Sequence, residues 1–144
     1  EMFVPFSKVS QMKMIFNSYN HLKKGGILLF MVCEAIPGTK EIDEKIIMTF
    51  SENETTKCAR IEPWEKEYNF LRWNPLLLIE ENGRFKQFTD HDEIQLYNKD
   101  ELKKYVEEVE DIGFVEKERY ELPVRDSSPP WATETIFVME KIGD

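Results

Sequence analysis

Apolar and polar positions in the first part of the chain follow the period of an amphipathic helix. Between residues 7 and 23 the apolar positions recur at spacings of three and four, which places them on one helical face. Ser7 suits the start of this helix, and Lys23 and Lys24 suit its negative end. The apolar positions are Val9, Met12, Ile15, Phe16, Tyr19 and Leu22.

The run ILLFMVC at residues 27–33 is apolar throughout, which predicts a strand covered on both faces. Gly25 and Gly26 separate the helix from this strand. Phosphate-binding glycines come in the opposite order, because the anion sits on free N–H groups where a helix starts. We therefore expect the two glycines to end the helix in a left-handed conformation and to turn the chain tightly.

The pattern changes after a loop that begins at residue 34. Residues 41–50 are predicted to form a short helix with its apolar residues on one side. Residues 51–97 contain short segments rich in aromatic and apolar residues, which predicts a small antiparallel sheet. The apolar residues of the expected helix are Ile42, Ile46, Ile47 and Phe50.

Local signals define further turns and helix ends. Asn82-Gly83 is a strong signal for a two-residue hairpin. Asn98 and Glu101 form a capping box at the start of a second helix, and Gly113 suits its end.

Two strands are expected after that helix, in FVEKERYEL and ATETIFVMEKI. We therefore predict an α/β core made of residues 1–50 and 98–144, with an inserted antiparallel β subdomain at 51–97.

Composition excludes several classes of partner. The chain has 144 residues and a net charge of −9, which argues against nucleic acid and against anionic membrane surfaces. Its longest strongly apolar run has seven residues, whereas a membrane-spanning helix needs about 20. The two cysteines are expected to be reduced thiols in a cytoplasmic protein.

Three segments together resemble class I S-adenosylmethionine-dependent methyltransferases. HLKKGGILLF (21–30) resembles the turn that leads into the fifth strand of that family. YNKDELKKYVEEVEDIGF (97–114) resembles the helix before the sixth strand. ENGRFKQFTDHDEIQLY (81–97) resembles the hairpin of a subgroup with a small antiparallel β insertion. The three segments occur in the family's order and span most of the chain.

The hairpin of that subgroup runs from a glycine through an aromatic residue to a histidine and a tyrosine. The subgroup often has an arginine two residues before the tyrosine, where this chain has Gln95, so the role of that arginine does not carry over. The matching positions here are Gly83, Phe85 or Phe88, His91 and Tyr97.

The resemblance implies the C-terminal half of a Rossmann-like sheet, in the order helix, strand, helix and two strands, with the β insertion. The family's cofactor glycine loop is absent, because none of the six glycines forms G-x-G. We expect the parent protein to use S-adenosylmethionine, through cofactor residues that this chain does not identify. The 144-residue chain is expected to be inactive and not to bind the cofactor tightly.

Candidate substrate-binding residues lie near the expected acceptor cleft. Glu34 follows the buried strand, where ligands bind in open α/β sheets, although it is also a plausible solvated strand end. Phe3 and Phe6 match a segment that borders the family's pocket, or they belong to the core.

Three more candidates come from the insertion and the last loop. His91 is expected to face the acceptor through its matching position, or to be a hydrogen-bonded surface histidine. Tyr97 matches the subgroup's tyrosine. Trp131 is a candidate for the wall of the cleft, with core packing as the alternative. The residues DHDE (90–93) alternate between strand faces, so no metal site is expected. The catalytic residues are unknown.

The favoured interpretation is methyl transfer to a small molecule. The first alternative is a non-catalytic binding or dimerisation module derived from the same fold, and the second is an accidental resemblance. Because the strand at 27–33 lacks a neighbour in a half fold, we also expect a homodimer or association through its exposed edge.

Overall fold

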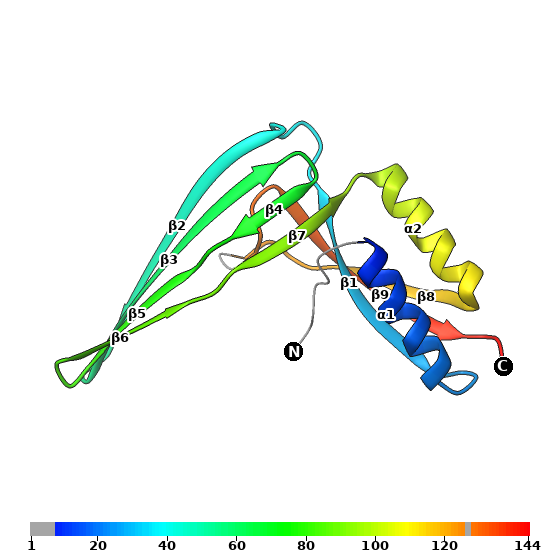
Figure 1. Ribbon diagram of the computed structural model, residues 1–144, viewed down its shortest axis with the longest axis horizontal. Coiled ribbons are helices and arrows are strands. Elements are labelled where there is room, and N and C mark those ends of the chain that lie inside the picture. The colour runs from blue at the N-terminus through cyan, green and yellow to red at the C-terminus, as the bar shows by residue number, and fades with distance from the viewer. Residues whose placement is uncertain (1–7, 126–127) are drawn as a thin grey trace. The chain divides into compact units, whose positions relative to one another are not determined.

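The computed structural model describes residues 8–125 and 128–144, and its elements are labelled in Figure 1. The chain forms two compact units. Unit 1 comprises Glu1–Thr39 and Ile94–Asp144, and unit 2 comprises Lys40–Glu93. Sequence analysis placed the two domain boundaries after residues 50 and 97 instead.

Unit 1 contains a mixed sheet centred on β1 (Ile27–Ala35) and β9 (Ala132–Lys141). These two strands pair antiparallel over nine residue pairs, from Ile27 opposite Glu140 to Ala35 opposite Ala132. β8 (Phe114–Glu121) pairs with the other side of β9. The two strands predicted after the second helix are therefore confirmed: β9 lies beside β1, and β8 lies beyond β9.

β7 (Asp92–Tyr97) reaches unit 1 with its last residues and pairs in parallel with the carboxyl end of β1. Its only register partners on β1, among the described residues, are Cys33 and Glu34. The segment 27–32 of β1 consequently has a paired neighbour on one side only within the described part of the chain.

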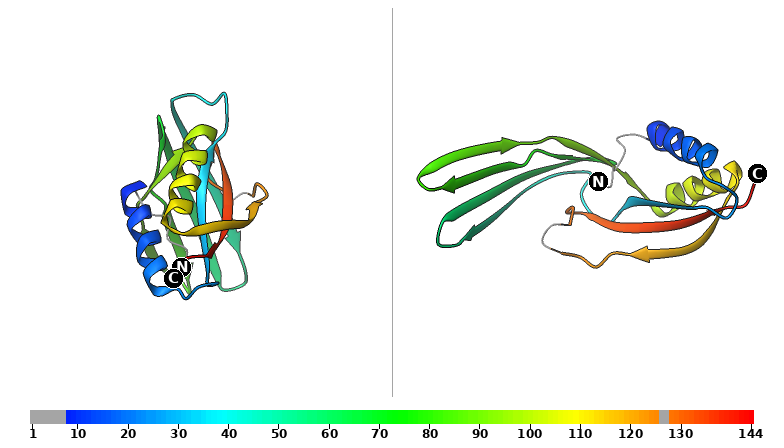
Figure 2. Two further views of the ribbon diagram at one scale, coloured as in Figure 1. Left: turned by 90° about the vertical axis from the view of Figure 1, so that its right-hand side faces the viewer. Right: turned by 90° about the horizontal axis from the view of Figure 1, so that it is seen from below.

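Helices α1 (Lys8–His21) and α2 (Lys99–Ile112) lie on the same face of this sheet (Figure 2). Asn98 caps α2 as predicted, because its Oδ1 accepts a hydrogen bond from the backbone N–H of Glu101 at 2.8 Å. α2 ends at Gly113, whose φ of 122° suits glycine.

The Gly25-Gly26 pair closes α1 and leads into β1, as predicted. Gly25 has a φ of 78° and donates its N–H to the carbonyl of Lys141 at 2.8 Å. The N–H of Gly26 donates to the carbonyl of Lys23 at 2.8 Å, and a Cβ on Gly26 would lie only 2.7 Å from that oxygen. Both glycine N–H groups therefore have backbone partners, one on β9 and one within the turn.

Lys141, the last residue of β9, is buried against the end of α1. Its Nζ donates to the carbonyls of Tyr19 and Leu22 at 2.8 and 2.9 Å. The same ammonium lies 4.0 Å from the centre of the Tyr19 ring. These contacts satisfy helix-end carbonyls that have no partner within the helix.

The core of unit 1 lies between the helices and the sheet. The rings of Phe30 and Phe137 stack with centroids 5.2 Å apart, and those of Tyr97 and Tyr105 are 5.3 Å apart. The buried members of this core are Ile15, Val32, Tyr97, Leu102, Tyr105, Val106, Val109, Phe114, Phe137 and Met139.

The opposite face of the sheet carries apolar residues that remain exposed. Leu29 is 63% exposed and Ile27 is 48% exposed.

On α1, Val9 and Phe16 are also exposed, although the helical pattern placed them on its apolar face. They line an open groove of about 600 Å³ that includes Ile112 of α2. Within the described residues, the first part of β1 is covered on its helix face only, whereas Cys33 near its carboxyl end is buried on the other face.

Unit 2 is a single curved layer of antiparallel strands (Figure 1). The long strand β3 pairs with β2 along one side and with β5 and then β4 along the other. β6 pairs with β5. The strands are β2 (Ile42–Glu52), β3 (Thr56–Glu67), β4 (Phe70–Trp73), β5 (Leu76–Glu81) and β6 (Arg84–Thr89).

The helix predicted for residues 41–50 is wrong, because this segment forms most of β2. Ile46, Met48 and Phe50 alternate with period two and point to one face, and β-branched isoleucines favour strands. Pairing with β3 over eleven residue pairs outweighs the weak helical spacing.

The hairpin predicted at Asn82-Gly83 is confirmed. Both residues have positive φ, 52° and 73°, as a two-residue turn of type I′ requires. The turn sets Glu81 opposite Arg84.

Alkaline pH is predicted to destabilise unit 1. Burial raises the pKa of the Cys33 thiol from 9.0 to about 12, with help from the charge of Glu134. Burial, with a smaller contribution from Glu101, raises the pKa of Tyr97 from 10.0 to about 12. Because folding favours both neutral forms, their contribution is complete below pH 9 and is lost as pH rises towards 12.

Thermal unfolding measured from pH 8 to 11 is expected to show a falling Tm. In Cys33→Ala the fall should begin about one pH unit higher, near the ordinary pKa of tyrosine. A Tm that stays constant across this range would contradict the raised pKa values of Cys33 and Tyr97.

Replacing Lys141 by methionine is predicted to destabilise the chain. Lys141→Met keeps an apolar stem but removes the donor for two helix-end carbonyls, which should cost about 1–3 kcal/mol. The control is Lys117→Met on β8, where an exposed ion pair with Glu140 is lost and the change should stay within about 0.5 kcal/mol. The unfolding midpoints of the two variants in denaturant measure the difference. Equal destabilisation by Lys141→Met and Lys117→Met would contradict the prediction.

Candidate functional site

Three of the predicted site residues gather at the carboxyl end of β1. Glu34 is the register partner of Tyr97 on β7. The carbonyl of Trp131 accepts a hydrogen bond from the N–H of Ile36, just beyond β1, at 2.9 Å. Ligands in open α/β sheets bind beyond the carboxyl ends of strands, so this edge is the candidate site of unit 1.

Tyr97 is buried at this edge and its hydroxyl is already bound. Its Oη donates to Oε1 of Gln11 on α1 at 2.7 Å, and its ring packs against Tyr105 of α2. Burial raises the pKa of Tyr97 to about 12, so the phenol remains protonated at neutral pH. In this structure Tyr97 joins β7 to both helices, and its predicted contact with substrate stays a prediction.

Gln95 has a role that sequence analysis missed. Its Oε1 accepts a hydrogen bond from the backbone N–H of Lys8 at 2.8 Å, at the start of α1. Lys8 is held further by its Nζ, which lies 2.7 Å from Oε1 of Glu108. An arginine at position 95 has only donors and could not accept from that N–H. The amide therefore holds the start of α1 against β7.

Glu34 lies in a mixed-charge groove of about 520 Å³ on the helix face of the sheet. Lys99 and Lys103 of α2 line the same groove. Arg119 of β8 lines it as well, and its guanidinium lies 4.5 Å from the centre of the Phe137 ring.

The guanidinium of Arg119 is held by hydrogen bonds to Glu116 rather than to Glu34. Its Nε and Nη2 donate to the two carboxylate oxygens of Glu116 at 2.8 and 2.9 Å. The hydrogen bonding of Arg119 to Glu116 raises the pKa of Arg119 most, and the negative charges of Glu116 and Glu34 raise it further. The groove can therefore bind a charged or strongly polar group. Glu34 is the only residue of the groove that the sequence analysis named as a substrate-binding candidate.

His91 lies in unit 2 and is hydrogen-bonded at the surface. Its Nδ1 donates to Oδ1 of Asn74 at 2.5 Å, and its Nε2 lies 3.8 Å from Oε1 of Glu93. The side chain is 56% exposed. These contacts match the alternative of a surface histidine, and its contact with an acceptor stays a prediction. Phe3, Phe6 and Ser7 lie outside the described residues.

Unit 2 contains a pair of stacked tryptophans. Trp64 and Trp73 stack with ring centroids 5.7 Å apart. The Nε1 of Trp73 donates to Oε1 of Glu62 at 3.0 Å, and Nη2 of Arg60 pairs with the same oxygen at 2.8 Å. Trp64 Nε1 is buried and has no acceptor among the described residues.

No group of three or more His, Cys, Asp or Glu side chains in residues 8–125 and 128–144 comes together in a way that could hold a metal ion. In the same part of the chain, no helix is long and apolar enough to cross a membrane.

Comparison with known proteins identifies the fold. No family model matches the sequence, and no curated protein matches it. Among solved structures, 95% of the chain superposes on 53% of an S-adenosylmethionine-dependent methyltransferase from Clostridium acetobutylicum, with a TM-score of 0.69 and 12% identity.

Two sugar-modifying enzymes are similar as well. The sugar N-methyltransferase KedS8 from Streptoalloteichus matches with a TM-score of 0.65 and 17% identity, over 95% of this chain and 51% of its own. CalS10, an amino pentose methyltransferase from Micromonospora echinaspora, matches with a TM-score of 0.58 and 15% identity, over 94% and 52%.

The chain spans about half the length of each of these solved structures. The fold expected from the sequence resemblance is confirmed: over its length, the chain is folded like part of a Rossmann-like S-adenosylmethionine-dependent methyltransferase.

Proposed function

We propose that this chain is the C-terminal part of an S-adenosylmethionine-dependent methyltransferase that acts on a small molecule. The observation that carries the proposal is the superposition of nearly the whole chain on about half of several such enzymes. The order of elements in unit 1, helix, strand, helix and two antiparallel strands, supports the C-terminal assignment.

The residues of this chain do not fit a cofactor site. The N–H of Gly25 donates to the carbonyl of Lys141 on β9, and the N–H of Gly26 donates to the carbonyl of Lys23 in the turn. The starts of α1 and α2 are bound by the side chains of Gln95 and Asn98. The N–H groups of the glycine turn are therefore not free to cradle a cofactor, and we propose that cofactor binding belongs to the parent protein.

In the proposed reaction, this chain would help to bind the methyl acceptor. Methyl transfer depends mainly on the alignment of donor and acceptor, so residues at the strand ends would position the acceptor. Glu34 and its groove suit a polar group of the acceptor. The acidity of the chain favours a small molecule over nucleic acid. The proposed acceptor-side residues are Phe3, Phe6, Glu34, His91, Tyr97 and Trp131.

The free edge of β1 supports association of the chain by itself. Residues 27–32 have a strand on one side only within the described residues, and Leu29 is exposed. An exposed apolar edge can pair with another chain. We therefore propose self-association through this edge for the 144-residue chain in a cytoplasmic setting.

A non-catalytic binding or dimerisation module is the second candidate function. It is favoured by the apolar residues that β2 exposes, since Phe50 is 74% exposed and Ile46 is 66% exposed. Exposed apolar surface of this kind marks interaction sites.

Titration of S-adenosylhomocysteine separates these proposals. In a calorimeter the 144-residue chain is expected to give no binding at micromolar ligand, because it lacks a fitting cofactor loop. Micromolar binding would refute the assignment of the cofactor site to the parent. The same titration on the full parent protein should show binding, and its absence there would refute the methyltransferase and favour the binding module.

A further inference from the structure

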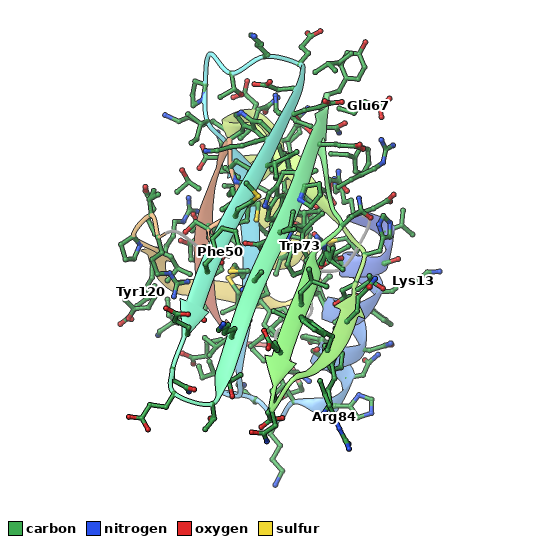
Figure 3. The ribbon with its side chains drawn as sticks, turned by 90° about the vertical axis from the view of Figure 1, so that its left-hand side faces the viewer. Lys13, Phe50, Glu67, Trp73, Arg84 and Tyr120 are labelled. Carbon is green, nitrogen blue, oxygen red and sulfur yellow. The ribbon has the colours of Figure 1, made fainter. Side chains whose placement is uncertain are left out.

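The end of β7 lies at the candidate site with little backbone pairing to β1. Within the described residues, β7 has two register pairs with β1, Cys33 with Leu96 and Glu34 with Tyr97, whereas β9 has nine. Parallel pairs are also slightly less stable than antiparallel ones. On its other side β7 neighbours β4 in the sheet order, and Trp73 of β4 is labelled in Figure 3. The position of the end of β7 beside β1 therefore depends on side-chain contacts as well.

Two side chains of β7 bind the first turn of α1. Residues two apart in a strand point to the same side of the sheet, as Gln95 and Tyr97 do here. The Oε1 of Gln95 accepts a hydrogen bond from the backbone N–H of Lys8 at 2.8 Å, and the Oη of Tyr97 donates to Oε1 of Gln11 at 2.7 Å. We call these two hydrogen bonds the β7–α1 latch. Lys8 and Gln11 are three residues apart, so the latch spans about one helical turn.

The surroundings of the latch make it firm. Tyr97 is 1% exposed and Gln11 is 3% exposed, so water is excluded from their hydrogen bond. Separating β7 from α1 would break this bond inside the protein, which is costly. The start of α1 is itself fixed on α2, because the Nζ of Lys8 pairs with Oε1 of Glu108 at 2.7 Å. The ring of Tyr97 also packs against Tyr105 of α2.

Gln95 supplies an acceptor to the start of α1 from outside the helix. The first N–H groups of a helix have no acceptor within it. In α2 the acceptor is Asn98, which directly precedes the helix, whereas Gln95 lies 87 residues from Lys8 in the sequence. The first turn of α1 contains no acidic residue. The strand therefore caps the helix, and the helix start in turn holds the strand.

We propose that Gln95 is a positioning residue of the candidate site. Together with the bond between Tyr97 and Gln11, it holds the end of β7 on α1 and thereby keeps Tyr97 beside Glu34 at the carboxyl end of β1. Gln95 acts through α1 rather than on the substrate. That the site binds a methyl acceptor rests on the proposed function, whereas the position of β7 does not.

The chemistry of the side chain at position 95 distinguishes this role from simple packing. Gln95→Glu keeps an acceptor and adds a negative charge at the positive end of α1, so it should keep the latch closed. Gln95→Met keeps the length of the side chain but removes the amide acceptor. Gln95→Arg supplies only donors and places a positive charge at the same end of the helix, so it should open the latch as well.

Hydrogen exchange of backbone amides in the 144-residue chain, followed by NMR, tests the inference. Gln95→Met should speed exchange about tenfold, the change expected for the loss of one hydrogen bond. The increase should appear at residues 8 and 12 of α1, and among residues 33–35 and 95–97 of the two strands, because these segments open together. Gln95→Glu should exchange like the unsubstituted chain.

The matched control is Gln87→Met. It makes the same substitution at an exposed glutamine of β6 and should leave the exchange of these segments unchanged. Tyr97→Phe is a second variant, which decides the question if Gln95→Met does not fold. It keeps the ring against Tyr105 but removes the donor to Gln11, and it should speed exchange in the same segments.

Three results would overturn the proposal. One is unchanged exchange among residues 33–35 and 95–97 in both Gln95→Met and Tyr97→Phe. Another is exchange as fast in Gln95→Glu as in Gln95→Met. The third is an equal increase throughout unit 1, with α2 and β8 included, which indicates general destabilisation. Failure of S-adenosylhomocysteine to bind the parent protein would instead refute the proposed function, and the exchange rates would still decide the role of Gln95.

Discussion

The antiparallel pairing of β1 with β9 is the constraint on which unit 1 depends. It joins two segments separated by about a hundred residues of sequence, and the stacked rings of Phe30 and Phe137 lie opposite each other within it. Both helices pack on the face that these rings help to form. At the carboxyl end of the same pair, the chain brings Glu34 near the loop residue Trp131. The register between β1 and β9 thus determines both the core of unit 1 and the position of its candidate site.

Elements with strong local signals could be predicted from the sequence. Asn98 and Gly113 mark the ends of α2, and Asn82-Gly83 marks a hairpin, because capping and turn geometry depend on adjacent residues. The segment 41–50 could not be assigned in the same way. Its isoleucines fit both a helical and an alternating pattern, and the strand that pairs with it lies further along the chain.

In the candidate site, too, local features could be predicted from the sequence and contacts between distant residues could not. Glu34 could be placed from the rule that ligands lie beyond strand ends, and the structure brings Tyr97 and Trp131 to the same edge. The bonds from Tyr97 to Gln11 and from Lys8 to Gln95 join residues more than eighty positions apart. No local pattern encodes such pairs, so these contacts required the tertiary structure.

The pairing of β1 with β9 has a consequence for the order of folding. The strands of unit 2 pair with near neighbours in sequence, whereas β1 pairs along its length with β9, about a hundred residues away. Lys141, which binds the last carbonyls of α1, is equally distant from that helix. Contacts between distant segments form more slowly than local ones, so β1 is expected to stay unpaired longest and to be the strand most exposed to aggregation while the chain folds.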